Sequence, residues 1–406
     1  MDPARAAQID IALRCCLLES YVFHFTTWFW FLILVLVPGT IRTSPPPPLD
    51  KGPVTLKPAY LLAPLLLVAS LATSQPSPLR IGDATARAGA AVSGFIDIPA
   101  GADSGTRIPV SIIRGSAAGP TLALIAGTHG SEVAPIIALQ RVRQSLDPAQ
   151  IRGTLILVHI ANMPSFLART IYYSPIDHKN LNRVYPGKRD GSVSERIAEA
   201  ITREVIDRSD YLVDIHSGDG NESLRPYTYW SKLGLDARTD SLGRMMALAW
   251  GNDHIVVDTD RPRDVKASVY TQNTAHLRGK PSITTEAGYL GVAAEDMVQR
   301  NVDGAFRLMR FLRMLPGEVQ LVEHPVWLDR TAVLTSPGTG VWHPRVDRGT
   351  TVQRGTVIGE LTDFFGNVVA QVRAPFAGEV LYVVGTPAMS KGEPVAMIGC
   401  AAEEKD

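Results

Sequence analysis

Two histidines and one glutamate stand at positions where their side chains could bind one metal ion together. His129 and Glu132 form an H-x-x-E pair directly after an apolar run, and His216 follows another apolar run. Imidazole nitrogen and carboxylate oxygen bind Zn²⁺ at roughly 2.0–2.2 Å, so such ligands must converge on one point. Two histidines and one carboxylate, with a fourth position left to water, are a known catalytic zinc pattern. We therefore expect one Zn²⁺ per chain at these three residues, although Co²⁺ or Mn²⁺ would tolerate the same ligands.

Glu286 is the residue that we expect to transfer protons at this site. It directly follows the short run 282–285, which has the length and composition of a strand. A carboxylate that points from a strand end into a metal site can take a proton from water and return it to a leaving amine. Without the neighbouring metal pattern, the same residue could be a surface charge or an ion-pair partner.

The segment 180–183 reads Asn-Leu-Asn-Arg and predicts a binding site for a substrate carboxylate. Arg183 presents a rigid fork of donors that can hold a carboxylate with two hydrogen bonds, and Asn182 can add a further donor. Arg169 lies in the same irregular region and is another candidate for substrate binding. The alternative for all three residues is a loop that is held together by its own side-chain hydrogen bonds.

The elements around these residues alternate between strands and helices. The predicted strands are 93–98, 108–113, 121–126, 154–160, 211–215 and 282–285. The predicted helices are 131–145, a segment that begins at Ser192 with a capping-box glutamate three residues later, 241–250 and 295–315. This order indicates an α/β fold with a mostly parallel or mixed sheet that is flanked by helices. In such sheets chemistry takes place beyond the carboxyl ends of the strands, where the candidate metal ligands and Glu286 fall.

The pattern of the sequence changes after residue 318. Glycine or proline recurs every few residues, and short valine-rich segments lie between them. This spacing is typical of short strands joined by turns. We therefore expect a catalytic domain over residues 76–318 and a small all-β domain over residues 319–406.

The overall composition excludes several classes of protein. The 40 basic and 40 acidic side chains balance, which gives no electrostatic footprint for nucleic acid. The chain has 3 cysteines, and their positions exclude a disulfide framework and any multi-cysteine metal site in the globular part.

The first 75 residues are predicted to be a leader. The apolar run 21–37 is at the lower edge of the length that can cross a bilayer. The shorter run 60–72 suits the core of a secretory signal, with Lys57 as its positive flank and a small-x-small pattern at 70–72. Residues 1–53 could be a membrane anchor or an over-extended gene start. Both interpretations place the catalytic part outside the cytoplasm, in the periplasm or the extracellular space, with a mature start near Thr73.

Taken together, four motifs resemble the succinylglutamate desuccinylase/aspartoacylase family, which belongs with the zinc carboxypeptidases of the M14 type. The motifs are Gly-Thr-His-Gly-Ser-Glu at 127–132, Asn-Leu-Asn-Arg at 180–183, Asp-Ile-His at 214–216 and Thr-Glu-Ala-Gly at 285–288. The resemblance covers roughly residues 81–315 and implies the carboxypeptidase-like fold.

The same resemblance assigns roles to individual residues. It implies zinc ligands at His129, Glu132 and His216, and a general base and acid at Glu286. It further implies that Asn182 and Arg183 bind a substrate carboxylate. One departure is Asn180, because the family often has aspartate before Leu-Asn-Arg.

The C-terminal segment looks like a barrel-sandwich hybrid of the biotinyl/lipoyl type. Carriers of that type display a lysine at a hairpin tip, whereas the corresponding turn at 362–367 contains none. We therefore expect a packing or gating domain instead of a carrier.

The expected activity is zinc-dependent hydrolysis of the amide bond in an N-acyl amino acid or a similar small amide that carries a carboxylate. One alternative is a metallocarboxypeptidase that acts on peptides, and another is a non-catalytic protein that binds carboxylates. The intact metal pattern and Glu286 argue against the second alternative. The sequence leaves open the acyl group, the amine, an esterase preference and the oligomeric state.

Overall fold

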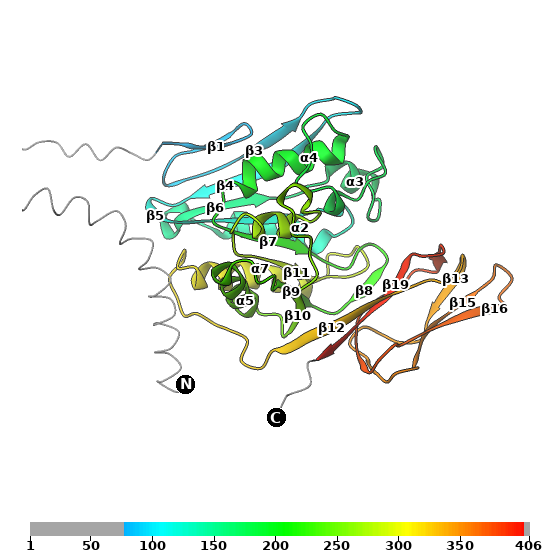
Figure 1. Ribbon diagram of the computed structural model, residues 1–406. Helices are drawn as coiled ribbons and strands as arrows, with labels where there is room; N and C mark the ends of the chain where they lie inside the picture. The colour runs from blue at the N-terminus through cyan, green and yellow to red at the C-terminus, as the bar shows by residue number, and fades with distance from the viewer. Residues whose placement is uncertain (1–76, 402–406) are drawn as a thin grey trace, which may run out of the picture. The chain divides into compact units, whose positions relative to one another are not determined.

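The computed structural model describes residues 77–401, and Figure 1 shows how their elements are arranged. The strands before residue 318 are β1 (Leu79–Ile81), β2 (Ala84–Ala86), β3 (Ala90–Ile98), β4 (Thr106–Arg114), β5 (Ala117–Ala126), β6 (Arg152–Val158), β7 (Tyr211–His216), β8 (Glu222–Leu224), β9 (Tyr227–Ser231), β10 (His254–Asp258) and β11 (Ser282–Glu286). The helices are α2 (Val133–Ser145), α3 (Met163–Ala168), α4 (Val193–Ile201), α5 (Ala237–Trp250), α6 (Thr271–His276) and α7 (Glu295–Phe311). Short helical turns are η1 (Pro148–Gln150), η2 (Leu181–Arg183), η3 (Thr202–Ile206) and η4 (Val265–Ala267).

The central strands form a mixed sheet, which confirms the expected α/β class. Strands β6, β5, β7 and β11 are neighbours and run parallel to one another, while β9 pairs with β11 in the antiparallel direction. Strands β4 and β3 extend the other side in the antiparallel direction. The parallel strands therefore end at the same edge of the sheet, which is the edge where the candidate active residues lie.

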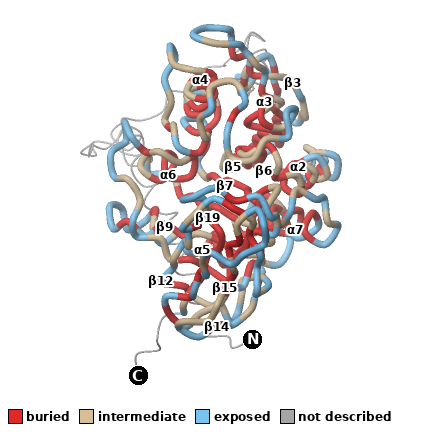
Figure 2. Tube along the Cα trace, turned by 90° about the vertical axis from the view of Figure 1, so that its right-hand side faces the viewer, coloured by how far each residue is buried: buried red, intermediate tan, exposed pale blue. Residues whose placement is uncertain are grey.

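Side chains of the central strands alternate between two buried layers, because successive residues of a strand point to opposite faces. In β5, Leu122 and Leu124 pack into the layer that contains α2, α5 and α7. Ala123 and Ile125 pack into the opposite layer, with residues of α4 and α6. Figure 2 shows buried residues along these central strands and on the helix faces that cover them. The near-continuous apolar strands of the sequence are thus explained by a sheet that is covered on both faces.

The strands after residue 318 continue the same sheet and add a second one. They are β12 (Val326–Thr335), β13 (Gly340–Pro344), β14 (Thr351–Val352), β15 (Val357–Thr362), β16 (Val368–Arg373), β17 (Gly378–Val384), β18 (Ala388–Met389) and β19 (Pro394–Ala401). Strand β12 pairs in parallel with β10, and β19, β17 and β14 follow it in the large sheet. The other strands form a separate four-stranded sheet, and the two sheets share a core around Trp342, Leu361 and Ile398.

Several predicted helix ends were wrong, including the start of α5, which lies at Ala237 instead of residue 241, and several short elements were not predicted. Helix α7 ends at Phe311 instead of at residue 315, because Arg313 adopts a left-handed backbone with φ +56°. Strands β8, β9 and β10 and helix α6 were not predicted. The leader and the expected export signal lie outside the described residues and stay predictions. No helix among residues 77–401 is long and apolar enough to cross a membrane.

Polar contacts fix the C-terminal strands to the catalytic part at β8 and β10. Strand β17 pairs with β8, with Tyr382 opposite Leu224. One residue after β8, Arg225 donates to Glu379 of β17 and to Asp253. His254 of β10 lies 3.1 Å from the same Glu379 carboxylate. The Glu379 carboxylate of the C-terminal strands thus contacts both Arg225 and His254 of the catalytic part.

Replacing Glu379 with alanine should lower the free energy of unfolding by about 1–3 kcal/mol, because Arg225 and His254 lose the carboxylate between them. The midpoint of urea unfolding measures this change. The matched control is Glu295→Ala, since Glu295 pairs with Arg141 on the exposed surface and exposed ion pairs contribute little. Equal midpoints for the two variants would contradict the structural role of Glu379.

Candidate active site

The candidate catalytic residues lie at or directly after the ends of neighbouring strands. His129 lies in the loop after β5, Glu132 is the N-cap residue of α2, and His216 is the last residue of β7. Glu286 is the last residue of β11 and is the register partner of His216 in the parallel ladder. Neighbouring residues at the same register of a sheet point to the same side. The topology therefore brings Glu286 next to His216, as the sequence analysis expected from the strand ends.

Two glycines give the loop after β5 its path. Gly127 has a left-handed φ of +67°, where residues with a side chain are strained. A Cβ on Gly130 would lie 2.2 Å from the backbone nitrogen of Phe166 in α3. The loop can pass this closely over α3 only with glycine at position 130. The Gly-Thr-His-Gly sequence thus places the His129 side chain over the end of the sheet.

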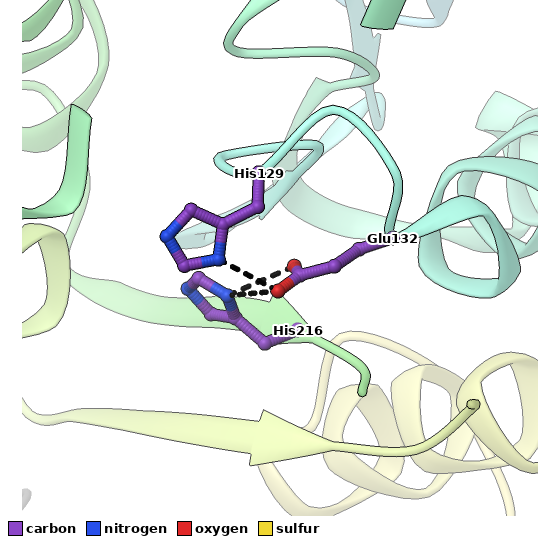
Figure 3. Close-up of side chains that lie close together, drawn as sticks. All are labelled: His129, Glu132 and His216. Carbon is purple, nitrogen blue, oxygen red and sulfur yellow. Dashed lines mark hydrogen bonds and ion pairs between the residues drawn. The ribbon is translucent and has the colours of Figure 1, made fainter. Parts of the chain in front are cut away.

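The side chains of His129, Glu132 and His216 meet at one point (Figure 3). Glu132 Oε1 lies 2.8 Å from His129 Nδ1 and 3.1 Å from His216 Nδ1. All ligand atoms of the three residues lie within 4.8 Å of one another. Glu132 Oε2 is buried and lies 2.9 Å from His216 Nδ1, yet makes no hydrogen bond. Converging nitrogen and oxygen atoms with an unsatisfied buried oxygen fit a divalent cation at this point.

The outer nitrogens of both imidazoles have partners that leave Nδ1 free for a metal ion. His129 Nε2 lies 3.1 Å from Asn180 Oδ1, which also accepts from the backbone N–H of Asn182. This second bond identifies the Asn180 atom as oxygen, so His129 Nε2 carries the proton. His216 Nε2 lies 3.1 Å from a carboxylate oxygen of Asp214 and 3.3 Å from Nδ2 of Asn182. Such partners orient ligating histidines and raise their basicity.

The local charges favour a cation between the two histidines. Burial lowers the pKa of His129, but the carboxylates of Asp219 and Glu132 outweigh burial and raise this pKa well above its usual range. The pKa of His216 is raised in the same way, against burial, by Glu132 and Asp214. In Glu132, the positive charges of His216 and His129 outweigh burial and lower the pKa to about 2. A site that attracts protons onto both imidazoles has the electrostatic character that a divalent metal ion requires.

Glu286 lies in an environment that suits a proton acceptor and donor. Burial raises the pKa of Glu286 well above its usual range, and the charge of Glu132 acts in the same direction, while His216 opposes it. A carboxylate whose pKa is raised by burial can hold a proton and release it within one reaction cycle.

A cavity of about 660 Å³ opens over these residues, which is a usual size for a small-molecule site. His129, Glu132, His216 and Glu286 all line it. Strands β12, β17 and β19 also contribute to its wall, through Thr331, Val333, Tyr382, Pro394 and Met397. The C-terminal strands therefore form part of the active-site wall.

Asn182 and Arg183 lie at one end of this cavity, in η2. Asn182 is buried, and its Oδ1 accepts from the backbone N–H of Thr271 at 2.9 Å, so its remaining donors lie near His216. The Arg183 guanidinium stacks on the ring of Tyr270 at 4.8 Å and donates only to the Asn182 carbonyl among the described residues. Arg183 therefore keeps donors that can bind a substrate carboxylate.

Arg169 does not join this group. It is exposed, has a left-handed φ of +57° and caps the end of α3. It does not line the cavity, so the expected role of Arg169 in substrate binding finds no support in the structure. Arg261 lines the cavity instead, stacks on Tyr270 at 4.3 Å and pairs with Asp258.

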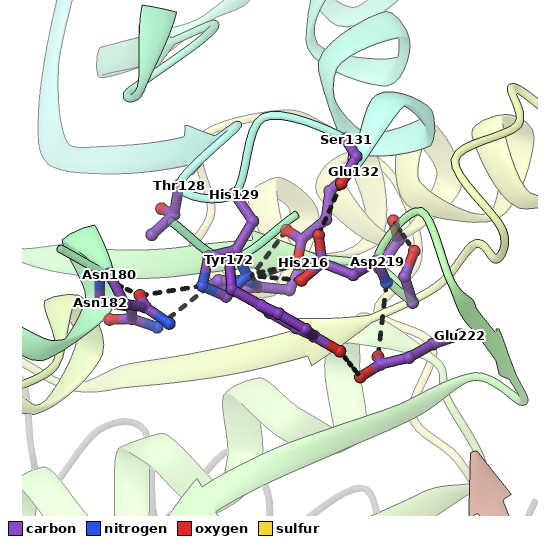
Figure 4. A network of polar contacts seen from close by, with 12 residues as sticks. Thr128, His129, Ser131, Glu132, Tyr172, Asn180, Asn182, His216, Asp219 and Glu222 are labelled. Carbon is purple, nitrogen blue, oxygen red and sulfur yellow. Dashed lines mark hydrogen bonds and ion pairs between the residues drawn. The ribbon is translucent and has the colours of Figure 1, made fainter. Parts of the chain in front are cut away.

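Three further residues extend the polar network of the site and were missed by the sequence analysis (Figure 4). Asp219 lies 3.2 Å from His129 Nδ1 and accepts from Ser131 at 2.7 Å. Tyr172 donates to Glu222 at 2.6 Å. Burial raises the pKa of Glu222 to about 7, and the charge of Asp219 raises it too. Asp219 follows His216 by three positions, and this short spacing was the one feature of the sequence that could have indicated that Asp219 lies near the site. Tyr172 and Glu222 lie in irregular loops or at a short strand, which carry no periodicity.

Comparison with known proteins places this site in a family. Residues 118–312 match the family model of the succinylglutamate desuccinylase/aspartoacylase catalytic domain. A curated relative is the N-alpha-acetyl-L-2,4-diaminobutyric acid deacetylase of Halomonas elongata. The two sequences are 30% identical over 323 residues, which cover 76% of this chain and 92% of the relative.

Solved structures share the fold of this chain. The product-bound ectoine utilization protein EutE (DoeB) from Ruegeria pomeroyi has a TM-score of 0.70 and 28% identity, and the match covers 80% of this chain and 98% of that one. A succinylglutamate desuccinylase from a Silicibacter species has a TM-score of 0.69 and 25% identity, with the same coverage of 80% and 98%. The expected carboxypeptidase-like fold is thus confirmed along most of the chain.

Replacing Asn180 with alanine should weaken Zn²⁺ binding by about 10–100-fold, because His129 loses the acceptor that orients its ring. Asn180→Asp keeps an acceptor at this position, so the aspartate variant should bind Zn²⁺ at least as tightly as the wild type. Titration against a chelator of known affinity measures both constants. Equal affinities for the alanine variant and the wild type would show that Asn180 does not support a metal ligand.

Proposed function

We propose that this chain, which belongs to the succinylglutamate desuccinylase/aspartoacylase family, is a zinc-dependent deacylase of small N-acyl amino acids. The observation that carries the proposal is the convergence of His129, Glu132 and His216 within 4.8 Å, with Glu286 at the register position beside His216. Two histidines and one carboxylate with an open fourth position form a catalytic zinc site and not a closed structural one.

The acyl group that we propose is acetyl. The curated relative from Halomonas elongata is named as a deacetylase of N-alpha-acetyl-L-2,4-diaminobutyric acid, and this chain matches 92% of its length. We therefore take that compound as the first substrate to test. A cavity of about 660 Å³ also suits a compact acyl amino acid.

Each of the cavity residues has a separate role in the proposed reaction. Zinc, when bound, would polarise the scissile carbonyl and make water more acidic. Glu286 takes the proton from the attacking water and then delivers it to the departing nitrogen. Arg183 holds the substrate carboxylate, so that the amide lies over the three ligands. Asn180 and Asp214 keep both imidazoles oriented throughout.

Export from the cytoplasm is a separate proposal. It rests on the predicted leader over residues 1–75, with its apolar run at 60–72 and the small-x-small pattern at 70–72. Cell fractionation of a tagged full-length chain, followed by N-terminal sequencing of the mature protein, tests it directly.

Replacing Glu286 with glutamine should lower kcat by about 10²–10⁴-fold while zinc stays bound, because the amide cannot accept or return the proton. Metal analysis and steady-state kinetics on the same protein sample separate these two effects. The matched control is Glu318→Gln, an exposed glutamate beyond α7. Near-normal turnover in a zinc-loaded Glu286→Gln variant would reject the proton-transfer role.

Replacing Arg183 with alanine should raise KM for N-acetyl amino acids by about 10–100-fold, because a charge-assisted pair with the substrate carboxylate is lost. The comparison substrate is the matching amino acid amide, which lacks that negative charge. Arg300→Ala on the exposed face of α7 is the control. An equal loss for the acid and the amide would show that Arg183 does not bind the carboxylate.

A further inference from the structure

Glu222 is a buried carboxylate in the active-site wall that has no cationic partner within the described part of the chain. Its side chain lines the cavity, and the residue is only 9% exposed. Its two oxygens accept from the Tyr172 hydroxyl at 2.6 Å and from the Asp219 backbone N–H at 3.4 Å. No lysine, arginine or histidine among residues 77–401 forms an ion pair with it. A buried carboxylate without a cation is unfavourable, and a positively charged ligand would relieve that cost.

Apart from the candidate ligand Glu132, the other carboxylates of the cavity either have partners or, like Asp260, are exposed to solvent. Asp219 lies against His129 and Ser131. Asp258 is paired with Arg261. Glu286 stands beside His216 in the sheet, where the reaction needs it. Glu222 is thus a buried cavity carboxylate that neither the metal site nor the proton transfer uses.

A second observation at the same place is a tyrosine hydroxyl that has no partner among the described residues. Tyr382 of β17 lines the cavity and is 8% exposed, and its hydroxyl has no hydrogen-bond partner in the described part of the chain. Burial and the negative charge of Glu222 raise its pKa well above the usual range, so this side chain stays a neutral hydroxyl close to Glu222. The hydroxyl can therefore accept a hydrogen bond from a ligand in the cavity.

Tyr172 connects Glu222 with the metal site. Its backbone has a φ of +62°, which is strained for a bulky residue. Its ring lies edge-on to His129, with 6.0 Å between the ring centroids, while its hydroxyl donates to Glu222. This conformation places the aromatic ring of Tyr172 between His129 and Glu222. Rings next to a carboxylate are a favourable surface for an ammonium group, through cation–π attraction.

The two ends of the cavity, on either side of the proposed metal site, thus carry opposite charges. Figure 4 shows Asn180 and Asn182 on one side of the two histidines and Glu222 on the other. Arg183, next to Asn182, gives the first end a positive charge, and Glu222 gives the second end a negative charge. An N-acyl amino acid with a second amino group has complementary charges for both ends.

We propose that Glu222, with the rings and hydroxyls of Tyr172 and Tyr382, binds a cationic amino group in the amine portion of the substrate and selects N-acyl diamino acids. This inference rests on the proposed deacylase function and adds the residue that determines specificity. The ammonium donates charge-assisted hydrogen bonds to Glu222 and to the Tyr382 oxygen, while the substrate carboxylate binds at Arg183.

The test compares two substrates that differ in charge but little in shape, Nα-acetyl-L-2,4-diaminobutyrate and Nα-acetyl-L-norvaline. Glu222→Gln keeps the size of the side chain and an acceptor for Tyr172. It should lower kcat/KM for the diamino substrate by about 10–100-fold and leave the norvaline derivative within about threefold. Glu222→Asp, which keeps the charge, should recover part of the preference. Glu318→Gln serves as the matched surface control.

A binding measurement separates this inference from the proposed function. Calorimetry of the zinc-loaded protein with free L-2,4-diaminobutyrate and free L-norvaline requires no turnover. The wild type should bind the diamino acid more tightly, and Glu222→Gln should remove the difference. If the protein hydrolyses no N-acyl amino acid, the proposed deacylase function is wrong. The calorimetry would still test whether Glu222 binds the second amino group, because it does not depend on turnover. Equal binding of both amino acids by the wild type, or equal losses for both substrates in Glu222→Gln, would overturn the inference.

Discussion

The arrangement depends on one electrostatic constraint, which is that several carboxylates and two imidazoles are buried at the same edge of a sheet. Such a group is stable only if positive charge is supplied among its members. Glu132 lies between the two histidines, and Asp214, Asp219 and Asn180 surround them. The parallel strands β5, β7 and β11 hold the backbone in place, so that the side chains cannot move apart. The fold therefore holds these groups where a bound cation would stabilise them.

The sequence predicted the parts of this arrangement that depend on local pattern. Apolar runs such as 121–126 could be read as strands because both of their faces are covered, and the ends of those strands located His129, His216 and Glu286. The capping box at Ser192 and Glu195 correctly located the start of α4. Asn180 was noted only as a departure from the family, whereas the structure shows that it orients His129.

Long-range pairing explains what the sequence did not predict. Strand β8 has three residues and is ordered by its pairing with β17, more than 150 positions later in the chain. Glu222 belongs to that strand, and Tyr172 lies in a loop whose backbone is strained. Neither position has a periodic pattern, because contacts with distant segments determine the conformation of both. Arg169 was proposed from its residue type and its place in a nearby loop, and the structure shows it exposed and outside the cavity lining.

The parallel pairing of β10 with β12 has a consequence for how the chain can be divided. A protein that stopped near residue 318 would leave β10 with an unpaired edge, and open edges of this kind promote self-association. It would also lack the β12, β17 and β19 side chains that enclose the cavity. The segment that carries His129, Glu132 and His216 is therefore not expected to be stable alone, because the C-terminal strands cover the edge of its sheet and enclose its cavity.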